Sequence, residues 1–274
     1  MRKFATKHPV IAFCVLNVFI LLPIIGGLNL WLFPASFDYT LMFPQWAPAI
    51  AAIIVVWLRN SKTGINELFK KASAKRSSLK WGLMAVIIPT IFTFATYIVL
   101  IYAEYGQWIM PTLPRSVGNY ALCFIATLFG SYGEEIGWRG FMLPQLNKKY
   151  SLFISSLIVG MFWGVWHMRF QLGLPAFGLY ILGVTCFSVL ISWLCSKTKG
   201  NMFVAIIFHT TINMCFLFLF ENILSDISQQ QTGVQINNTH LYAMLYGIIA
   251  IVFAIPCIFV VKNMLGKRNT HQIE

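Results

Sequence analysis

Two carboxylates, one guanidinium, two imidazoles and one amide lie within three apolar segments of this sequence. An ionisable residue at the centre of a membrane helix costs about 2.5–3.5 kcal/mol, and it usually faces a bundle interior or a watery cavity. Solvating each group separately would multiply that cost, so we expect all six side chains to converge on one polar pocket. They are Glu134, Glu135, Arg139, His167, His209 and Asn213.

The adjacent carboxylates Glu134 and Glu135 are expected to have different roles. Glu135 and Arg139 have the i,i+4 spacing, so they can form a salt bridge on one face of a helix. Glu134 points about 100° away around the same helix, and that pair does not account for it. A carboxylate next to a like charge, outside the salt bridge, is suited to act as a general base.

The histidines in the apolar segments are expected to belong to the same site. A lone buried histidine is most often a hydrogen-bonded core residue, but two beside a glutamate pair favour catalysis. His209 and Asn213 lie one helical turn apart, so both can reach one bound group. Asn17 is isolated in the first apolar segment and is expected to connect helices by a hydrogen bond. The aromatic residues near His167 are expected to pack rather than to contact substrate: Phe162, Trp163, Trp166 and Phe170.

The composition places these residues in a membrane protein. Of 274 residues, 58% are hydrophobic and 10% charged, whereas soluble domains carry about 25% charged residues. The mean hydropathy is +0.72. The net charge of +12 does not indicate a nucleic-acid partner, because the basic residues lie between hydrophobic runs, where they set membrane orientation. The six cysteines lack metal-ligand spacing and are expected to be buried apolar residues.

The apolar runs define the expected fold. A membrane-spanning helix needs about 20 mainly apolar residues, and the sequence contains eight candidates. We therefore predict an all-α fold, a polytopic transmembrane helix bundle of about eight spans that forms a single integral membrane domain over residues 1–274. The spans are Val10–Phe33, Gln45–Leu58, Trp81–Tyr102, Val117–Leu143, Ser151–His167, Ala176–Cys195, Met202–Phe220 and Tyr242–Val261.

Lysine and arginine are distributed unequally over the loops between these spans. If each span crosses the membrane, successive loops lie on opposite sides. Counted in this way, 18 of the 20 basic residues fall on the side of the N-terminus, and only Arg115 and Arg169 fall on the other side. Cytoplasmic loops carry the excess of basic residues, so we predict that both termini of this multi-pass cell (plasma) membrane protein are cytoplasmic. The basic stretch 59–80 is expected to be partly helical, and the active cavity is expected to face the cytosol.

Three motifs resemble those of the CPBP family, the CAAX proteases and bacteriocin-processing (Abi) proteins. That family carries Glu-Glu-x-x-x-Arg, Phe-x-x-x-His and His-x-x-x-Asn/Asp on successive spans. One such motif would be a weak signal, but three in order over residues 118–220 are specific and mark this range as the catalytic core. Here they read Glu134-Glu135-x-x-x-Arg139, Trp163-x-x-x-His167 (with Trp in place of Phe) and His209-x-x-x-Asn213.

The resemblance implies an intramembrane endopeptidase. Glu134 would activate a water for attack on a peptide carbonyl, and His167 would assist. His209 and Asn213 would stabilise the developing oxyanion. Hydrolysis requires these residue types in any case, because a carboxylate must accept a proton and preorganised donors must meet the new negative charge.

The resemblance leaves the role of a metal open. Glu135 and Arg139 would hold the shape of the site in either mechanism. Family members are commonly called metalloproteases, and Glu134, His167 and His209 could provide three zinc ligands with an open position for water. We expect a mechanism without an obligatory metal, and keep zinc as the close alternative, because an amide one turn beyond His209 suits an oxyanion better than zinc.

The expected partners are membrane lipids and a membrane-associated peptide or protein. Its cleavage would serve bacteriocin or signalling-peptide processing, or immunity. A rival function is a proton-coupled membrane transporter with a glutamate–histidine relay, but the sequence lacks the two matched halves that would favour it. A second rival is a non-catalytic bacteriocin-immunity protein with the same fold, against which the intact Glu134, His167 and His209 argue.

Overall fold

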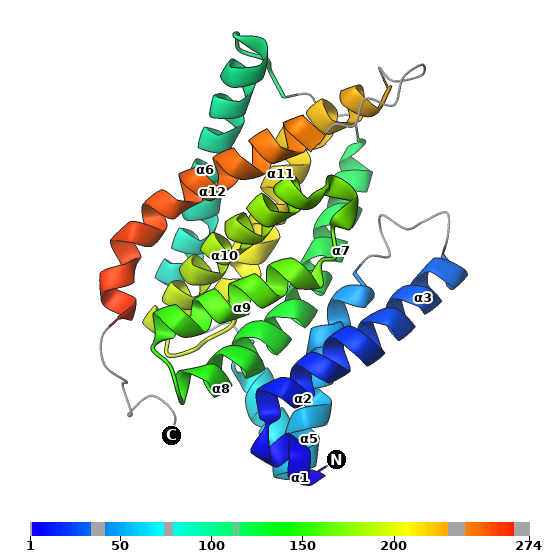
Figure 1. Cartoon of the computed structure of the whole chain (residues 1–274), viewed down its shortest axis with the longest axis vertical. Helices are drawn as coiled ribbons and strands as arrows, with labels where there is room; N and C mark the ends of the chain where they lie inside the picture. Colours follow the sequence, from blue (N-terminus) through cyan, green and yellow to red (C-terminus); the bar gives the residue numbers. More distant parts are fainter. Residues whose placement is uncertain are drawn as a thin grey trace.

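The computed structural model describes residues 2–33, 42–73, 79–111, 113, 115–229 and 239–265, and every regular element in these ranges is helical. The longer helices run obliquely past one another (Figure 1). They are α2 (Pro9–Val15), α3 (Leu22–Leu32), α5 (Ala47–Lys70), α6 (Leu79–Tyr105), α7 (Val117–Glu135), α9 (Leu152–Trp166), α10 (Leu174–Lys197), α11 (Phe203–Gln229) and α12 (Thr239–Met264). The short elements are α1 (Arg2–Lys7), α8 (Leu143–Asn147), the 3-10 helices η3 (Pro44–Trp46) and η6 (Phe170–Leu172), and the π-helices η1 (Leu16–Leu21) and η5 (Ile136–Met142).

Five helices of the described chain are long and apolar enough to cross a membrane: Pro9–Leu32, Leu79–Tyr105, Leu174–Lys197, Phe203–Glu221 and Thr239–Met264. Large apolar side chains point outward from them, such as Phe19 (76% exposed) and Phe259 (75% exposed). Such exposure is costly in water but expected for helix faces in contact with lipid. The chain is therefore a multi-pass membrane protein.

The other three predicted spans are also helical, although they are shorter or carry charge. Two are the apolar helices Pro44–Arg59 and Leu152–Trp166. The third runs from α7 through η5 to α8 and contains the charged motif. The basic stretch that begins at Arg59 continues α5 as far as Lys70, so part of it is helical, as expected.

Glycines allow α7 and η5 to pack closely against the start of α5. A Cβ atom added at Gly133 would lie 2.8 Å from the Trp46 ring, and one added at Gly137 would collide with Pro48. Small residues serve this purpose widely in membrane helix pairs, because they let the backbones approach. Glu134 and Glu135, which lie between these glycines, are therefore fixed on a rigid pair of helices.

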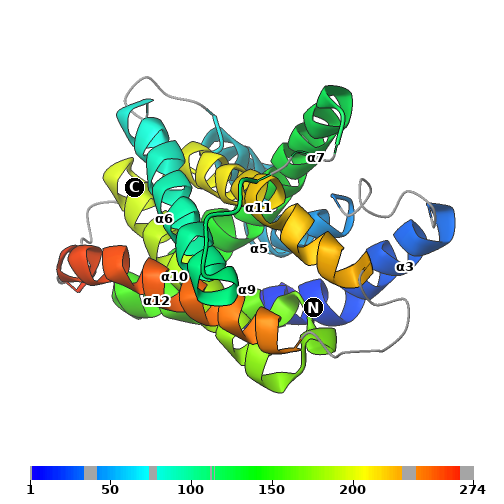
Figure 2. The same cartoon turned by 90° about the horizontal axis from the view of Figure 1, so that it is seen from above.

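Two further glycines join α9 to α10. A Cβ atom at Gly160 would lie 2.6 Å from the Cα of Thr185, and one at Gly164 would lie 2.9 Å from the Cα of Ile181. The Ser188 hydroxyl also donates a 2.8 Å hydrogen bond across this contact to a carbonyl of α9. Figure 1 shows α9 alongside α10 and oblique to α7, and Figure 2 shows the same bundle from above. Near the end of α9, Trp163 is within hydrogen-bond distance of Glu134 on α7.

Candidate active site

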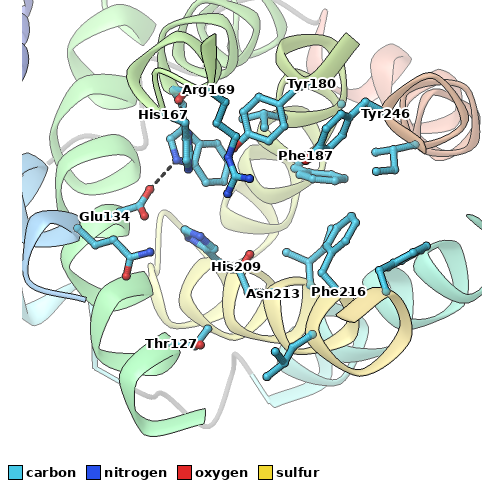
Figure 3. Close-up of a pocket in the computed structure, with 18 of the residues that line it drawn as sticks. Thr127, Glu134, His167, Arg169, Tyr180, Phe187, His209, Asn213, Phe216 and Tyr246 are labelled. Carbon is cyan, nitrogen blue, oxygen red and sulfur yellow. Dashed lines mark hydrogen bonds between the residues drawn. The ribbon is translucent and has the colours of Figure 1, made fainter. Parts of the chain in front are cut away.

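A cavity of about 660 Å³ lies among α7, α9, α10, α11 and α12. Four of the predicted site residues line it: Glu134 from α7, His167 after α9, and His209 and Asn213 from α11 (Figure 3). In contrast to the prediction that all six residues line the pocket, Glu135 and Arg139 are absent from its wall. They lie behind it because they form an ion pair with each other, buried in the bundle.

Glu135 is the centre of a buried ionic cluster. Its Oε1 atom accepts hydrogen bonds from Arg139 Nη1 at 2.9 Å and from His209 Nδ1 at 2.9 Å. The Glu135 and Arg139 side chains are 0% and 1% exposed, and the Arg139 guanidinium lies 4.6 Å from the centroid of the Trp163 ring. The cluster spans η5 and α11, so it fixes the His209 ring with one edge toward the cavity.

Glu134 is held by two tryptophans. Its Oε2 atom accepts hydrogen bonds from Trp163 Nε1 at 2.5 Å and from Trp138 Nε1 at 3.2 Å. The other oxygen, Oε1, is buried and has no hydrogen-bond partner among the described residues. One oxygen therefore anchors the side chain, and the other is available to accept a proton.

The hydrogen bonds of the two histidines define their tautomers. His167 Nδ1 lies 2.8 Å from the Trp163 carbonyl oxygen, and His209 Nδ1 lies 2.9 Å from the Glu135 carboxylate. Because a carbonyl and a carboxylate only accept, the Nδ1 atom of each ring carries the proton. Each Nε2 atom is then left for chemistry in the cavity.

The cavity is elongated and closed at one end. It extends along α7 from Glu134 to Arg115, which lies just before that helix; the helix is roughly 25 Å long from its start to Glu134 at about 1.5 Å per residue. Arg115 pairs with Glu221 at 2.6 Å, and both side chains are partly exposed. Beyond Glu134 the bundle is filled by buried side chains, including Trp138 and Met142. The open end is therefore the end that contains the Arg115–Glu221 pair.

Several functional residues were not predicted from the sequence. Trp163 was expected only to pack, but its indole also holds Glu134, and Trp138 was overlooked in the same role. A buried indole N–H needs an acceptor, so the tryptophans beside the motif carboxylates were the available signal. Arg169 and Tyr180 also line the cavity, and only the position of Arg169 two residues after His167 pointed to it.

The residues assigned to packing behave largely as expected. Trp166 Nε1 donates a 3.1 Å hydrogen bond to Asn17 Oδ1, which confirms that Asn17 connects helices. Of the six cysteines, Cys195 and Cys257 are buried, and the other four are half-buried. The expectation of buried cysteines is therefore wrong for those four, and Cys123 instead lines the cavity.

Known proteins are similar to this chain in the region that contains the candidate site. Residues 115–215 match the family described as type II CAAX prenyl endopeptidase Rce1-like, a range that contains all six predicted site residues. Over this range the chain is similar to the CAAX-protease family. CAAX prenyl protease 2 of Methanococcus maripaludis is 27% identical over 61% of this chain and 68% of its own length.

Other relatives of this family are named for resistance to lysostaphin. Lysostaphin resistance protein A of Staphylococcus haemolyticus is 26% identical over 83% of this chain. The protein of that name in Staphylococcus aureus (strain Newman) is 24% identical over 66% of this chain. The matches span 61% and 43% of the lengths of these two relatives, so they are the longer proteins.

The site meets only part of what a zinc ion would require. Both histidines have the orientation of zinc ligands, with Nδ1 bound to a carboxylate or a carbonyl and Nε2 available. Their spacing does not match, since in the described ranges no three His, Cys, Asp or Glu side chains are grouped closely enough to hold a metal. No step of the chemistry below is therefore assigned to a metal.

We predict that Arg139→Ala lowers the free energy of unfolding by about 3–5 kcal/mol, because it leaves the buried Glu135 carboxylate without its guanidinium partner. Arg115→Ala is the matched control, and loss of its partly exposed pair should cost only about 0–1 kcal/mol. Glu134→Gln keeps an acceptor for the indoles and should melt like the parent protein. Thermal unfolding in detergent measures all three, and equal melting temperatures would show that Arg139 has no structural role.

Proposed function

We propose that this protein is an intramembrane endopeptidase that hydrolyses a peptide bond in a membrane-associated peptide or protein. The observation that supports this most directly is the buried Glu134 carboxylate, which faces the same cavity as two oriented histidines and an amide. Water, a peptide carbonyl and a base must meet in such a site, and a cavity closed at one end can bring them together.

In the proposed reaction, Glu134 Oε1 accepts a proton from water as the water oxygen attacks the carbonyl carbon. His167 Nε2, whose lone pair is available in this tautomer, accepts a hydrogen bond from the same water and orients it. The carbonyl oxygen becomes an oxyanion beside His209 and Asn213. Glu134 then delivers its proton to the leaving amine. Each step uses general acid–base catalysis or electrostatic stabilisation by preorganised donors.

His209 must be doubly protonated to donate to that oxyanion. Its Nδ1–H is already bound to Glu135, so the second proton has to be on Nε2. The Glu135 Oε1 atom that accepts from this ring also accepts from Arg139. In this proposal Glu135 and Arg139 act on the reaction only through the position and charge of His209.

We also propose the topology that the basic residues indicate: eight spans with both termini cytoplasmic, in the plasma membrane. Arg115 and Arg169, the two basic residues counted on the outer side, both line the cavity. Arg115 lies at its open end. This orientation therefore opens the cavity to the extracytoplasmic side, and it replaces the expectation of a cavity open to the cytosol.

A second candidate function is resistance or immunity without proteolysis. The observation that favours it is the name of the Staphylococcus relatives, lysostaphin resistance protein A, which states resistance and no enzymatic activity. Both functions predict the same fold, but only an endopeptidase needs the Glu134 carboxylate to accept a proton.

We predict that Glu134→Gln lowers proteolysis at least about 100-fold, since general acid–base catalysis contributes about 10²–10⁴-fold. Membrane peptidomes of cells that carry the parent chain, Glu134→Gln or Glu104→Gln provide the measurement. Glu104 is exposed on α6 and is not among the residues that line the cavity, so its variant should release the same peptides as the parent. Identical peptides from all three chains would favour the non-catalytic function.

We predict that purified protein keeps its activity after treatment with a strong chelator, because water activation is assigned to Glu134 and His167. Elemental analysis of the same sample reports the metal content. If activity is lost, returns with added zinc, and one zinc ion is bound per chain, then zinc held by Glu134, His167 and His209 is the correct mechanism.

We predict that a cysteine at position 170 reacts with a membrane-impermeant maleimide in intact cells, whereas one at position 70 reacts only after permeabilisation. Phe170→Cys lies in η6 beside the cavity, Lys70→Cys lies at the end of α5, and both positions are exposed. The parent chain gives the background from the native cysteines. The reverse pattern would place the cavity on the cytosolic side and the termini outside.

A further inference from the structure

We propose that Arg169 is a carboxylate-binding residue of the substrate cavity. This inference rests on the proposed function in one respect, namely that the carboxylate belongs to the peptide to be cleaved. Arg169 lines the cavity together with Glu134 and His209. Figure 3 shows its side chain extending into the space between His167 and Tyr180, with the guanidinium facing the cavity.

The backbone after α9 places this side chain. Met168 has a φ of 49°, a left-handed conformation that is uncommon outside glycine. This conformation ends α9 and turns the chain back, and the turn is closed by a 3.1 Å hydrogen bond from the Leu172 amide to the Arg169 carbonyl. Arg169 is therefore held at a fixed distance from His167 by a short, hydrogen-bonded turn.

Two tyrosines hold the guanidinium from one side. Its Cζ atom lies 5.2 Å from the centroid of the Tyr180 ring. Tyr246 also interacts with Arg169, and the two tyrosine rings pack edge to face with centroids 5.1 Å apart. The Tyr180 ring in turn packs against the His167 ring, with the two ring centroids 5.5 Å apart. This arrangement orients the planar guanidinium without neutralising its charge.

The charge of Arg169 is not balanced by a carboxylate in the described chain. The two other arginines near the cavity are balanced, because Arg139 pairs with Glu135 and Arg115 pairs with Glu221. Arg169 is exposed and lies after the end of α9, and an unpaired charge on the wall of a cavity raises the local concentration of oppositely charged ligands. A guanidinium fork matches a carboxylate with two parallel hydrogen bonds, so a carboxylate is the ligand that this position fits.

The wall beside Arg169 indicates what the carboxylate is attached to. Aromatic and aliphatic side chains of α10, α11 and α12 form this part of the cavity: Val184, Phe187, Phe216, Phe220, Leu245 and Ile249. An apolar side chain of the substrate can be buried there while the carboxylate is bound to Arg169. The carboxylate can come from the C-terminus of the peptide or from an acidic side chain, and the experiment separates these sources.

The test measures binding without cleavage, in the full-length Glu134→Gln chain purified in detergent. The probes are three libraries of N-acetylated apolar tetrapeptides: free acids, C-terminal amides, and amides in which one residue is glutamate. Retained peptides are quantified by mass spectrometry. We expect at least one carboxylate-bearing library to be retained about tenfold better than the plain amides, and the library retained identifies the source of the carboxylate.

Variants then assign this preference to Arg169. Arg169→Gln should abolish it, Arg169→Lys should keep part of it because the charge remains, and Arg59→Gln, a control outside the cavity wall, should leave it intact. Thermal melting checks that each variant is folded. The proposal is overturned if the three libraries are retained equally or if none is retained. It is also overturned if the preference for a carboxylate survives Arg169→Gln. Because no cleavage is measured, these outcomes are independent of whether Glu134 supports proteolysis.

Discussion

The buried ion cluster of Glu135, Arg139 and His209 is the constraint on which the rest of the site depends. A carboxylate or a guanidinium alone in an apolar bundle would have a desolvation penalty of several kcal/mol. Together, with Arg139 Nη1 and His209 Nδ1 each 2.9 Å from Glu135 Oε1, they stabilise the buried carboxylate and require their helices to lie at fixed positions. The position of η5 relative to α11, and hence of His209 relative to Glu134, follows from this pairing.

Close helix packing makes that constraint rigid. Glycines lie on the face of α7 and η5 that contacts α5 and the turn before it, and they leave no room there for a Cβ atom. The helix that carries both glutamates therefore cannot rotate without collision. The π-helix begins directly after Glu135, and π-helical turns within longer helices are frequent at functional sites. Here the widened turn begins between Glu135 and its partner Arg139, so both motif carboxylates, Glu134 and Glu135, lie in the last turn before it.

The sequence was sufficient to predict the helical fold and the four residues that the cavity brings together. The cost of burying charge predicts that Glu134, His167 and His209 converge, and three spaced motifs make the match specific. What could not be predicted depends on three-dimensional contacts. No sequence rule identifies the indoles of Trp138 and Trp163 as the donors to one oxygen of Glu134, because aromatic residues are abundant in membrane spans. The burial of Glu135 and Arg139 behind the cavity wall could not be predicted either, because it depends on how α5 packs against η5.

The two histidines explain why this site is compatible with two kinds of chemistry. Each ring is fixed through Nδ1, and each presents Nε2 to the cavity, which is the arrangement of a zinc-binding histidine and also of a histidine that binds water or an oxyanion. The difference lies in the charge of His209. A neutral ring offers a lone pair to a metal, whereas an imidazolium offers a proton to an oxyanion. Glu135 Oε1 accepts hydrogen bonds from both Arg139 and His209, so one carboxylate oxygen joins the buried ion pair to the ring that faces the cavity. Glu135 and Arg139 therefore act on the site through the position of His209, although neither of them lines the cavity.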